Sequence, residues 1–107
     1  MQSSLFRLRI TAEMREEIKR RLRKAFNVTR LEIQDDSAQH AGHTTNPHAG
    51  GHFTALVVSK NFEDLSLLER HRLVYDALGD LMGREIHAFS MKTVTPGEYD
   101  RLKESSV

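Results

Sequence analysis

The sequence contains no cysteine, no long apolar run and no marked excess of charge of one sign. Without cysteine the chain forms no disulfide, and it offers neither a thiol nucleophile nor a thiolate metal ligand. Any metal chemistry must therefore use histidine, carboxylate or the sulfur of a partner. With 16 basic and 15 acidic residues the formal charge is +1, so the chain as a whole is not expected to attract polyanions by its net charge.

No apolar stretch approaches the ~20 residues of a membrane-spanning helix, and the start lacks the apolar core of a secretory signal. We therefore expect an intracellular, cytoplasmic protein without a membrane partner. Residues 1–11 carry Arg7 and Arg9 together with serines and no acidic residue, as organelle presequences do. An ordinary frayed terminus is the simpler interpretation of this segment, and a mitochondrial location is the alternative.

Sequence patterns typical of catalysis are missing too. No serine lies in a G-x-S-x-G setting, and the pair Gly50-Gly51 is too weak a pattern to predict a phosphate-binding loop. Asp35 and Asp36 are adjacent carboxylates, but they follow a predicted strand, where turn formation explains them. We therefore expect a protein that works by binding and is not an enzyme.

A chain of 107 residues is expected to form one domain, and 38% hydrophobic with 29% charged residues is ordinary for a globular protein. An apolar residue recurs at every fourth position from Met14 to Phe26. This spacing predicts an amphipathic helix, with Thr11 as its cap. We place a flexible N-terminal segment at residues 1–11 and the domain at residues 12–104.

The rest of the chain predicts alternating strands and helices. Ser66 and Glu69 form a capping box for a second helix that runs to Gly83, and Thr95 precedes Pro96 at the start of a last helix. The expected elements are a helix over residues 12–26, a strand over 30–34, a loop over 36–51, a strand over 52–59, a helix over 66–83, a strand over 85–93 and a helix from 95.

This order, α-β-β-α-β-α, predicts an α/β (α+β) fold with a three-stranded sheet and helices packed on one face. The first two strands are expected to form an antiparallel hairpin, and the third to lie parallel to one of them. The second helix should turn a set of apolar residues toward the sheet. These residues are Leu67, Val74, Ala77, Leu78 and Leu81.

Histidine is the side chain placed to do distinctive chemistry. Four of the six histidines lie close together in and beside the predicted loop: His40, His43, His48 and His52. Each one alone is explained as a solvated side chain, but neutral imidazole is a common metal ligand, and a long loop can bring one or more to a shared site. His87 is the candidate ligand from a second element, and a backbone-bonded histidine is the alternative there. A stand-alone zinc or copper site in the loop is a weaker hypothesis.

The first predicted helix has a basic surface made of Arg15, Lys19, Arg20, Arg21, Arg23 and Lys24. A solvated helix face, partly neutralised by Glu16 and Glu17, explains it, and attraction to nucleic-acid phosphates or an acidic protein is the alternative. His71 lies between Arg70 and Arg72, where a metal cation would be repelled. We expect a structural or interface role for His71.

Taken together, the sequence resembles the BolA family from the first helix to about residue 99. The motifs that carry the resemblance are Leu31-Glu32-Ile33, Asp35-Asp36-Ser37, His52-Phe53, Val57-Val58-Ser59 with Phe62, Arg70-His71-Arg72 with Val74-Tyr75, Ile86-His87-Ala88 and Thr93-Val94-Thr95-Pro96. Each motif is short, but their order and spacing together are specific. The resemblance implies a class II KH-like fold, which agrees with the predicted element order.

The resemblance also implies a partner, because BolA-like proteins pair with monothiol glutaredoxins in heterodimers bridged by a [2Fe-2S] cluster. Glutaredoxin and glutathione would supply sulfur ligands, while this chain would supply His87 and a loop residue, for which His40 has the expected position. The loop is longer than usual for the family, so His43 or His48 could replace His40. His52 is expected to position the loop, with iron ligation as a further substitute. Imidazole in place of thiolate raises a cluster's potential, which suits a labile site.

The family is also described as transcriptional regulators, so DNA is the alternative partner. The residues for that role would be Arg15, Lys19, Arg20, Arg23, Arg70 and Arg72. No G-x-x-G loop of the KH type is present, so base readout by that route is unsupported. We expect the isolated chain to be a monomer or weak homodimer without a tightly bound cofactor.

Overall fold

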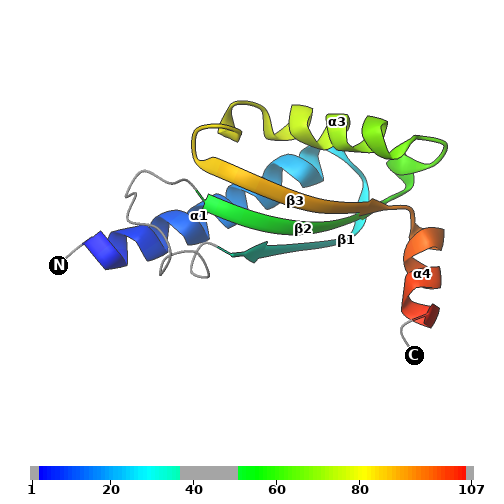
Figure 1. Cartoon of the computed structure of the whole chain (residues 1–107), viewed down its shortest axis with the longest axis horizontal. Coiled ribbons are helices and arrows are strands. Elements are labelled where there is room, and N and C mark those ends of the chain that lie inside the picture. Colours follow the sequence, from blue (N-terminus) through cyan, green and yellow to red (C-terminus); the bar gives the residue numbers. More distant parts are fainter. Residues whose placement is uncertain (1–2, 37–50, 106–107) are drawn as a thin grey trace.

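The structure is a computed structural model that describes residues 3–36 and 51–105 (Figure 1). Its elements are α1 (Ser3–Ala25), β1 (Val28–Asp35), β2 (Gly51–Ser59), the 3-10 helix η1 (Lys60–Phe62), α3 (Leu67–Leu78), the 3-10 helix η2 (Gly79–Leu81), β3 (Ile86–Val94) and α4 (Pro96–Ser105). This order confirms the predicted α+β fold class. Residues 37–50, most of the predicted loop, lie outside the described residues.

The three strands form one mixed sheet in the order β1-β2-β3. β1 runs antiparallel and β3 parallel to β2, as predicted: Val57 of β2 lies opposite both Leu31 and Thr93. Phe53 and Val57 are buried in the core with residues of α1 and α3, whereas Thr54 between them is exposed. We call the sheet face that carries Thr54 the open face.

The predicted apolar stripe of α1 packs into the core. Ile18 and Leu22 are fully buried, and the Phe26 ring centroid lies 5.2 Å from that of Phe62 in η1. Burying side chains of this size contributes roughly 1.5–3 kcal/mol each. The core therefore joins α1 to the end of β2, where η1 begins.

The start of α1 differs from the prediction. The helix begins at Ser3, so Thr11 lies inside it and is not its cap. No glycine or proline interrupts this stretch of sequence, and nothing local stops the helix from continuing past a polar residue. No helix in the described part of the chain is long and apolar enough to cross a membrane.

α3 begins as predicted and ends earlier. The Ser66 hydroxyl accepts the N–H of Glu69 (3.1 Å), and the Glu69 carboxylate accepts the N–H of Ser66 (2.8 Å). The α-helix ends at Leu78 because Gly79 adopts a φ of 55°, a conformation that glycine adopts without a steric penalty. The chain then continues as η2, so the prediction that Gly83 caps this helix was wrong.

The predicted buried face of α3 is correct except at its start. Val74 and Leu78 are fully buried, but Leu67 is 61% exposed. The space beneath this first turn is taken by Arg70, whose guanidinium carbon lies 6.0 Å from the Phe62 ring centroid. The Arg70 side chain therefore occupies the position under the first turn of α3 that the apolar pattern predicted for Leu67.

Arg70 also connects α3 to α4 through hydrogen bonds and an ion pair. Its guanidinium donates to the carbonyls of Leu65 (3.1 Å) and Thr93 (3.0 Å) and binds both oxygens of Glu98 (2.7 and 3.2 Å). Glu98 accepts the N–H of Thr95 (2.8 Å) as well, which confirms the predicted cap. The hydrogen bonds from Arg70, and next the one from the Thr95 N–H, lower the pKa of Glu98 to about 2.

Candidate functional site

The parallel pairing of β2 and β3 changes register at its first residues. Gly51 lies opposite Ile86, but the next residue, His52, lies opposite Ala88. His87 is therefore an extra residue on β3, as in a β-bulge. An extra residue interrupts the strict alternation of side chains between the two faces, and here it brings His87 beside His52.

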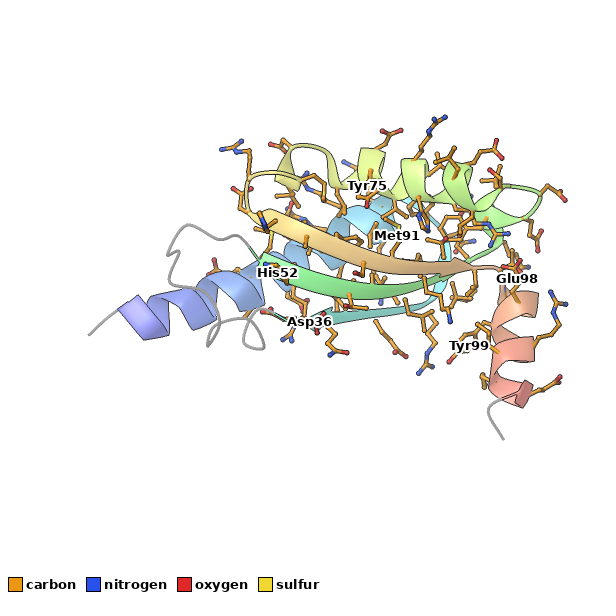
Figure 2. All side chains as sticks on the ribbon, in the orientation of Figure 1. Asp36, His52, Tyr75, Met91, Glu98 and Tyr99 are labelled. Atoms are coloured by element: carbon orange, nitrogen blue, oxygen red, sulfur yellow. The ribbon has the colours of Figure 1, made fainter. Side chains whose placement is uncertain are left out.

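The two imidazole rings are neighbours at this end of the sheet. Their centroids lie 5.3 Å apart, and their planes are inclined by 50°. His87 is exposed and His52 is half-buried at the start of β2 (Figure 2). A neutral imidazole offers a nitrogen lone pair to a transition metal. We call His52 and His87 the histidine pair, and it is accessible from solvent.

Asp36 continues the open face next to the histidine pair (Figure 2). Its N–H donates to the carbonyl of His52 (2.7 Å). One carboxylate oxygen accepts from the Gln34 amide (2.8 Å), and the other accepts from the Thr54 hydroxyl. These contacts of the Asp36 backbone and side chain fix the end of β1 beside His52, while the residues after Asp36 that would complete the predicted turn lie outside the described residues.

The remaining predicted ligands His40, His43 and His48 lie outside the described residues. The loop that contains them leaves the sheet after Asp36 and returns at Gly51, and both ends adjoin His52. The described residues hold no group of three or more histidine, cysteine or acidic side chains that could bind a metal ion. Among the described histidines, the two that lie side by side are those of the histidine pair.

The basic residues predicted on α1 are partly engaged with acidic neighbours. Lys19 lies 3.7 Å from a Glu16 oxygen, while Arg20 and Arg21 both bind the carboxylate of Glu17. Hydrogen bonds from Arg20 and then Arg21 lower the pKa of Glu17. Exposed ion pairs of this kind contribute little to stability, so these cations remain able to exchange partners.

A groove between α1 and α3 is lined by Glu17, Arg20, Arg21, Lys24, Ala25 and Ala77. Arg21 spans it and donates to the carbonyl of Leu78 (2.7 Å) and the carboxylate of Asp80 (3.0 Å). Of the other predicted nucleic-acid contacts on this helix, Arg23 is exposed and Arg15 is half-buried. The helix therefore presents a basic surface at the groove.

The Arg70-His71-Arg72 motif divides into three environments. The Arg70 side chain is only 11% exposed and is bonded within the protein, which makes it a poor candidate for a phosphate contact. Arg72 is exposed. The Nε2 atom of His71 is buried and has no hydrogen-bond partner among the described residues, in keeping with a structural or interface role.

The sequence did not predict the contact between His52 and His87: His52 was expected to position the loop, with iron ligation only as a substitute role. Each histidine lies at the start of a predicted strand, and the two strands were expected to be neighbours if parallel. Aligning their starts would have suggested the contact. The extra residue that completes it has no local signal in the sequence.

A three-stranded mixed sheet with helices on one face, and an accessible histidine pair at one end of its open face, defines the class: a small α+β domain with a candidate site on its open face. A family model described as BolA-like protein matches residues 22–98. The chain belongs to the BolA family.

Similar proteins come from plants and bacteria. The chain is 40% identical to SufE-like protein 1, chloroplastic/mitochondrial, of Arabidopsis thaliana over 76% of this chain and 23% of that protein. It is 34% identical to the DNA-binding transcriptional regulator BolA of Escherichia coli (strain K12) over 86% of this chain and 85% of that one. The solved BolA domain of SufE1 from Arabidopsis thaliana superposes with a TM-score of 0.69 at 39% identity, covering 79% and 94% of the two chains. The chain spans less than two thirds of the length of several relatives.

Proposed function

We propose that this protein is a non-enzymatic adaptor that pairs with a monothiol glutaredoxin and shares a bridging [2Fe-2S] cluster with it. Its role would lie in iron–sulfur cluster trafficking or assembly, or in sensing iron and redox state. The observation that carries the proposal is the exposed His87 with a second imidazole 5.3 Å away. We place the protein in the cytoplasm or, since a relative is named chloroplastic/mitochondrial, in mitochondria.

The side chains present fit one iron of such a cluster. Two imidazoles replace two thiolates on one iron in known two-iron clusters, and His87 is exposed to an approaching partner. Because the chain has no cysteine, the thiolate ligands would come from glutaredoxin and glutathione. The site is therefore half of a shared one.

We assign the second ligand to His40, with His43, His48 and His52 as substitutes. His40 follows Asp36 by four residues, and the N–H of Asp36 binds His52. Four extended residues span at most about 14 Å, so the His40 imidazole can reach the neighbourhood of His87. The short tether supports His40 over His43, whereas His48, three residues before Gly51, is tethered as closely and stays a substitute.

The proposal is tested by mixing the full chain with a cluster-loaded monothiol glutaredoxin and recording visible circular dichroism. The wild type is expected to change the spectrum because the ligands of one iron change. His87→Ala should remove most of that change, since it deletes the exposed ligand without touching the core. A wild-type mixture with the spectrum of glutaredoxin alone would contradict the proposal.

The controls separate ligand loss from general damage. His71→Gln changes a histidine on another element and should leave the spectral change intact. Single alanine variants of His40 and His52 then identify the second ligand. If His52→Ala abolishes the change and His40→Ala does not, the second ligand is His52, and the assignment to His40 is wrong.

The second candidate function is DNA binding, and it is favoured by the basic surface of α1 and by the similarity to the DNA-binding transcriptional regulator BolA of Escherichia coli. Arg20, Arg23 and Arg72 would contact phosphates. Arg15 and Lys19 would add to the positive electrostatic potential that attracts the DNA backbone. Arg70 is left out because its guanidinium is engaged inside the protein. Among the described residues no base-reading element accompanies these cations, so the binding would be mainly electrostatic.

DNA binding would weaken steeply with added salt, because each phosphate contact releases counterions. Replacing Arg20 and Arg23 with glutamate should abolish it, while His87→Ala should not. A fluorescence-anisotropy titration with a duplex at several salt concentrations measures both effects. Equal binding by the doubly reversed variant would remove this candidate.

A further inference from the structure

The outer edge of β3 is only partly covered. β3 is the last strand of the sheet and pairs with β2 alone. At its start the Gly83 N–H donates to the Ile86 carbonyl (2.9 Å), and near its end Arg70 donates to the Thr93 carbonyl (3.0 Å). Between these two points no strand or loop of the described chain pairs with the edge.

The backbone groups left open on this edge can be identified. In a strand, alternate residues direct both N–H and C=O to the same edge. Because the Thr93 carbonyl points outward to Arg70, the N–H and C=O groups of Met91 and Phe89 point outward too. Ser90 and Lys92 then direct theirs to β2. The free edge therefore offers the donors and acceptors of Phe89 and Met91.

Two exposed apolar side chains of α3, Leu68 and Tyr75, lie beside this edge, and we call them the apolar shoulder. Ala77 faces the groove with α1, and Val74 is fully buried in the core. At 100° per residue, Leu68 and Tyr75 lie on the opposite side of the helix from Ala77, and they are 60% and 42% exposed. Figure 2 shows Tyr75 extending from α3 on the side of β3, where Met91 lies. This shoulder points away from α1 and toward the free edge.

We propose that a second copy of this chain pairs with the free edge, antiparallel about a two-fold axis at Ser90, to form one continuous six-stranded sheet. The axis must pass through a residue, since otherwise the buried and open faces would not match. With the axis at Ser90, Phe89 of each copy exchanges both backbone hydrogen bonds with Met91 of the other. The outward N–H and C=O groups of Phe89 and Met91 then all have partners, as buried polar groups require.

Charge and packing agree with this register. Lys92 lies opposite Ala88 of the second copy, so no like charges meet. An axis at Lys92 would place two lysines face to face, which destabilises a strand pair. An axis at Met91 would pair Phe89 with Thr93, whose carbonyl already serves Arg70. Of the axes at Ser90, Met91 and Lys92, the Ser90 axis avoids both problems, and it places the apolar pair of Phe89 and Met91 together on the helix-covered face.

The other edge of the sheet is protected in a way that β3 is not. β1 carries the ion pair of Arg30 with Glu32 (2.5 Å), and its pairing with β2 is irregular between Val28 and Arg30. Charged side chains and bulges are the usual protection of edge strands. Within its open stretch β3 carries one charge, Lys92. The second copy is therefore expected on β3 and not on β1.

The chain contains no cysteine, so a single introduced cysteine provides a unique cross-linking site. Ser90→Cys and the control Gln34→Cys both lie exposed on the open face, one on each edge strand. At the axis, opposite Cα atoms of a non-hydrogen-bonded pair are about 4.5 Å apart, within the disulfide range of about 4.4–6.8 Å. Under a mild oxidant Ser90→Cys should form a covalent dimer, while Gln34→Cys stays monomeric.

Sedimentation equilibrium of the unmodified chain tests the same dimer without a cross-link. The wild type is expected to show reversible monomer–dimer exchange. Ser90→Lys places two ammonium groups opposite each other and should abolish the dimer, whereas Gln34→Lys should leave it intact; far-UV circular dichroism confirms that both remain folded. The proposal is overturned by a wild type that is monomeric at every concentration, by a dimer that survives Ser90→Lys, or by Gln34→Cys linking as fast as Ser90→Cys.

Discussion

Arg70 joins three elements through one guanidinium. It holds the chain before α3 at Leu65, the end of β3 at Thr93 and the first turn of α4 at Glu98. Bidentate pairing with a carboxylate is the arrangement in which an arginine ion pair is strongest. The sequence analysis placed Arg70 among possible phosphate contacts, because residue type alone does not reveal that a cation is already satisfied by its own fold.

The pair of Arg70 and Glu98 makes stability depend on acid pH. The pKa of Glu98 is lowered from 4.5 to about 2, so its contribution is present above about pH 4.5 and is lost as the pH falls through about 2. Glu98→Gln should therefore lower the free energy of unfolding by about 1–2 kcal/mol at pH 7, because it breaks a charge-assisted hydrogen bond that is still partly solvated. Urea unfolding of both proteins from pH 7 to pH 2 measures the difference.

The difference between wild type and Glu98→Gln should shrink as the pH falls below about 4.5, because the carboxylate of the wild type becomes protonated. Glu104→Gln is a suitable control, since Glu104 is exposed on the same helix. It should change the free energy of unfolding by less than about 0.5 kcal/mol. A cost of Glu98→Gln that is equal at pH 7 and pH 2 would show that the ion pair does not lower this pKa.

At the scale of elements, periodic and local sequence signals predicted the elements correctly, whereas individual helix ends and the strand register were not predicted. The every-fourth-residue apolar stripe of α1 and the capping box at Ser66 are periodic or local signals, and the structure confirms both. The start of α1 at Ser3, the end of α3 at Leu78 and the extra residue at His87 were not predicted. Each depends on the backbone conformation at one position, and that conformation is determined by packing against neighbouring elements.

The candidate site shows the same division. His87 was predicted from its strand, but its neighbour His52 was given another role, because two residues far apart in sequence meet only through the register of parallel strands. A register shift of one residue changes which side chains share a face. No pattern within either strand contains that information, whereas the absence of a thiol could be seen from composition alone.

Replacing Gly79 or Gly97 with alanine should change the free energy of unfolding in opposite directions. Gly79 has a φ of 55° where α3 ends, while Gly97 lies in the first turn of α4 with nothing within 4 Å of an added methyl group. Gly79→Ala should lower the free energy of unfolding by about 1–3 kcal/mol through backbone strain. Gly97→Ala should raise it by about 0.4–1 kcal/mol, because alanine restricts the unfolded chain.

Thermal unfolding followed by circular dichroism compares the two glycine variants with the wild type. Opposite shifts of the midpoint are expected, since both changes add one methyl group and differ only in backbone conformation. If Gly79→Ala were as stable as the wild type, the positive φ would not be what ends α3. The end of α3 would then have to be explained by its packing and not by either glycine, Gly79 or Gly83.

At the scale of the whole molecule, the hydrophobic core and the candidate site lie on opposite faces of the sheet. One hydrophobic core lies between the sheet and the two helices α1 and α3; its buried residues come from β2, β3 and the helices, and the half-buried Leu31 and Ile33 of β1 pack against it. The open face carries the polar side chains of Gln34, Asp36 and Thr54 and the histidine pair. Changes at the histidines can therefore alter ligand binding without loosening the core.

A matched pair of leucines on α3 tests whether the core behaves as one unit. Leu78 is fully buried among residues of both layers, whereas Leu68 is 60% exposed. Leu78→Ala should lower the free energy of unfolding by about 2–5 kcal/mol through lost burial and a cavity, and Leu68→Ala by less than about 0.5 kcal/mol. Urea unfolding followed by far-UV circular dichroism and by tyrosine fluorescence should give coincident transitions for both, as one cooperative domain requires. Separate transitions, or equal costs for the two leucines, would contradict a single core between sheet and helices.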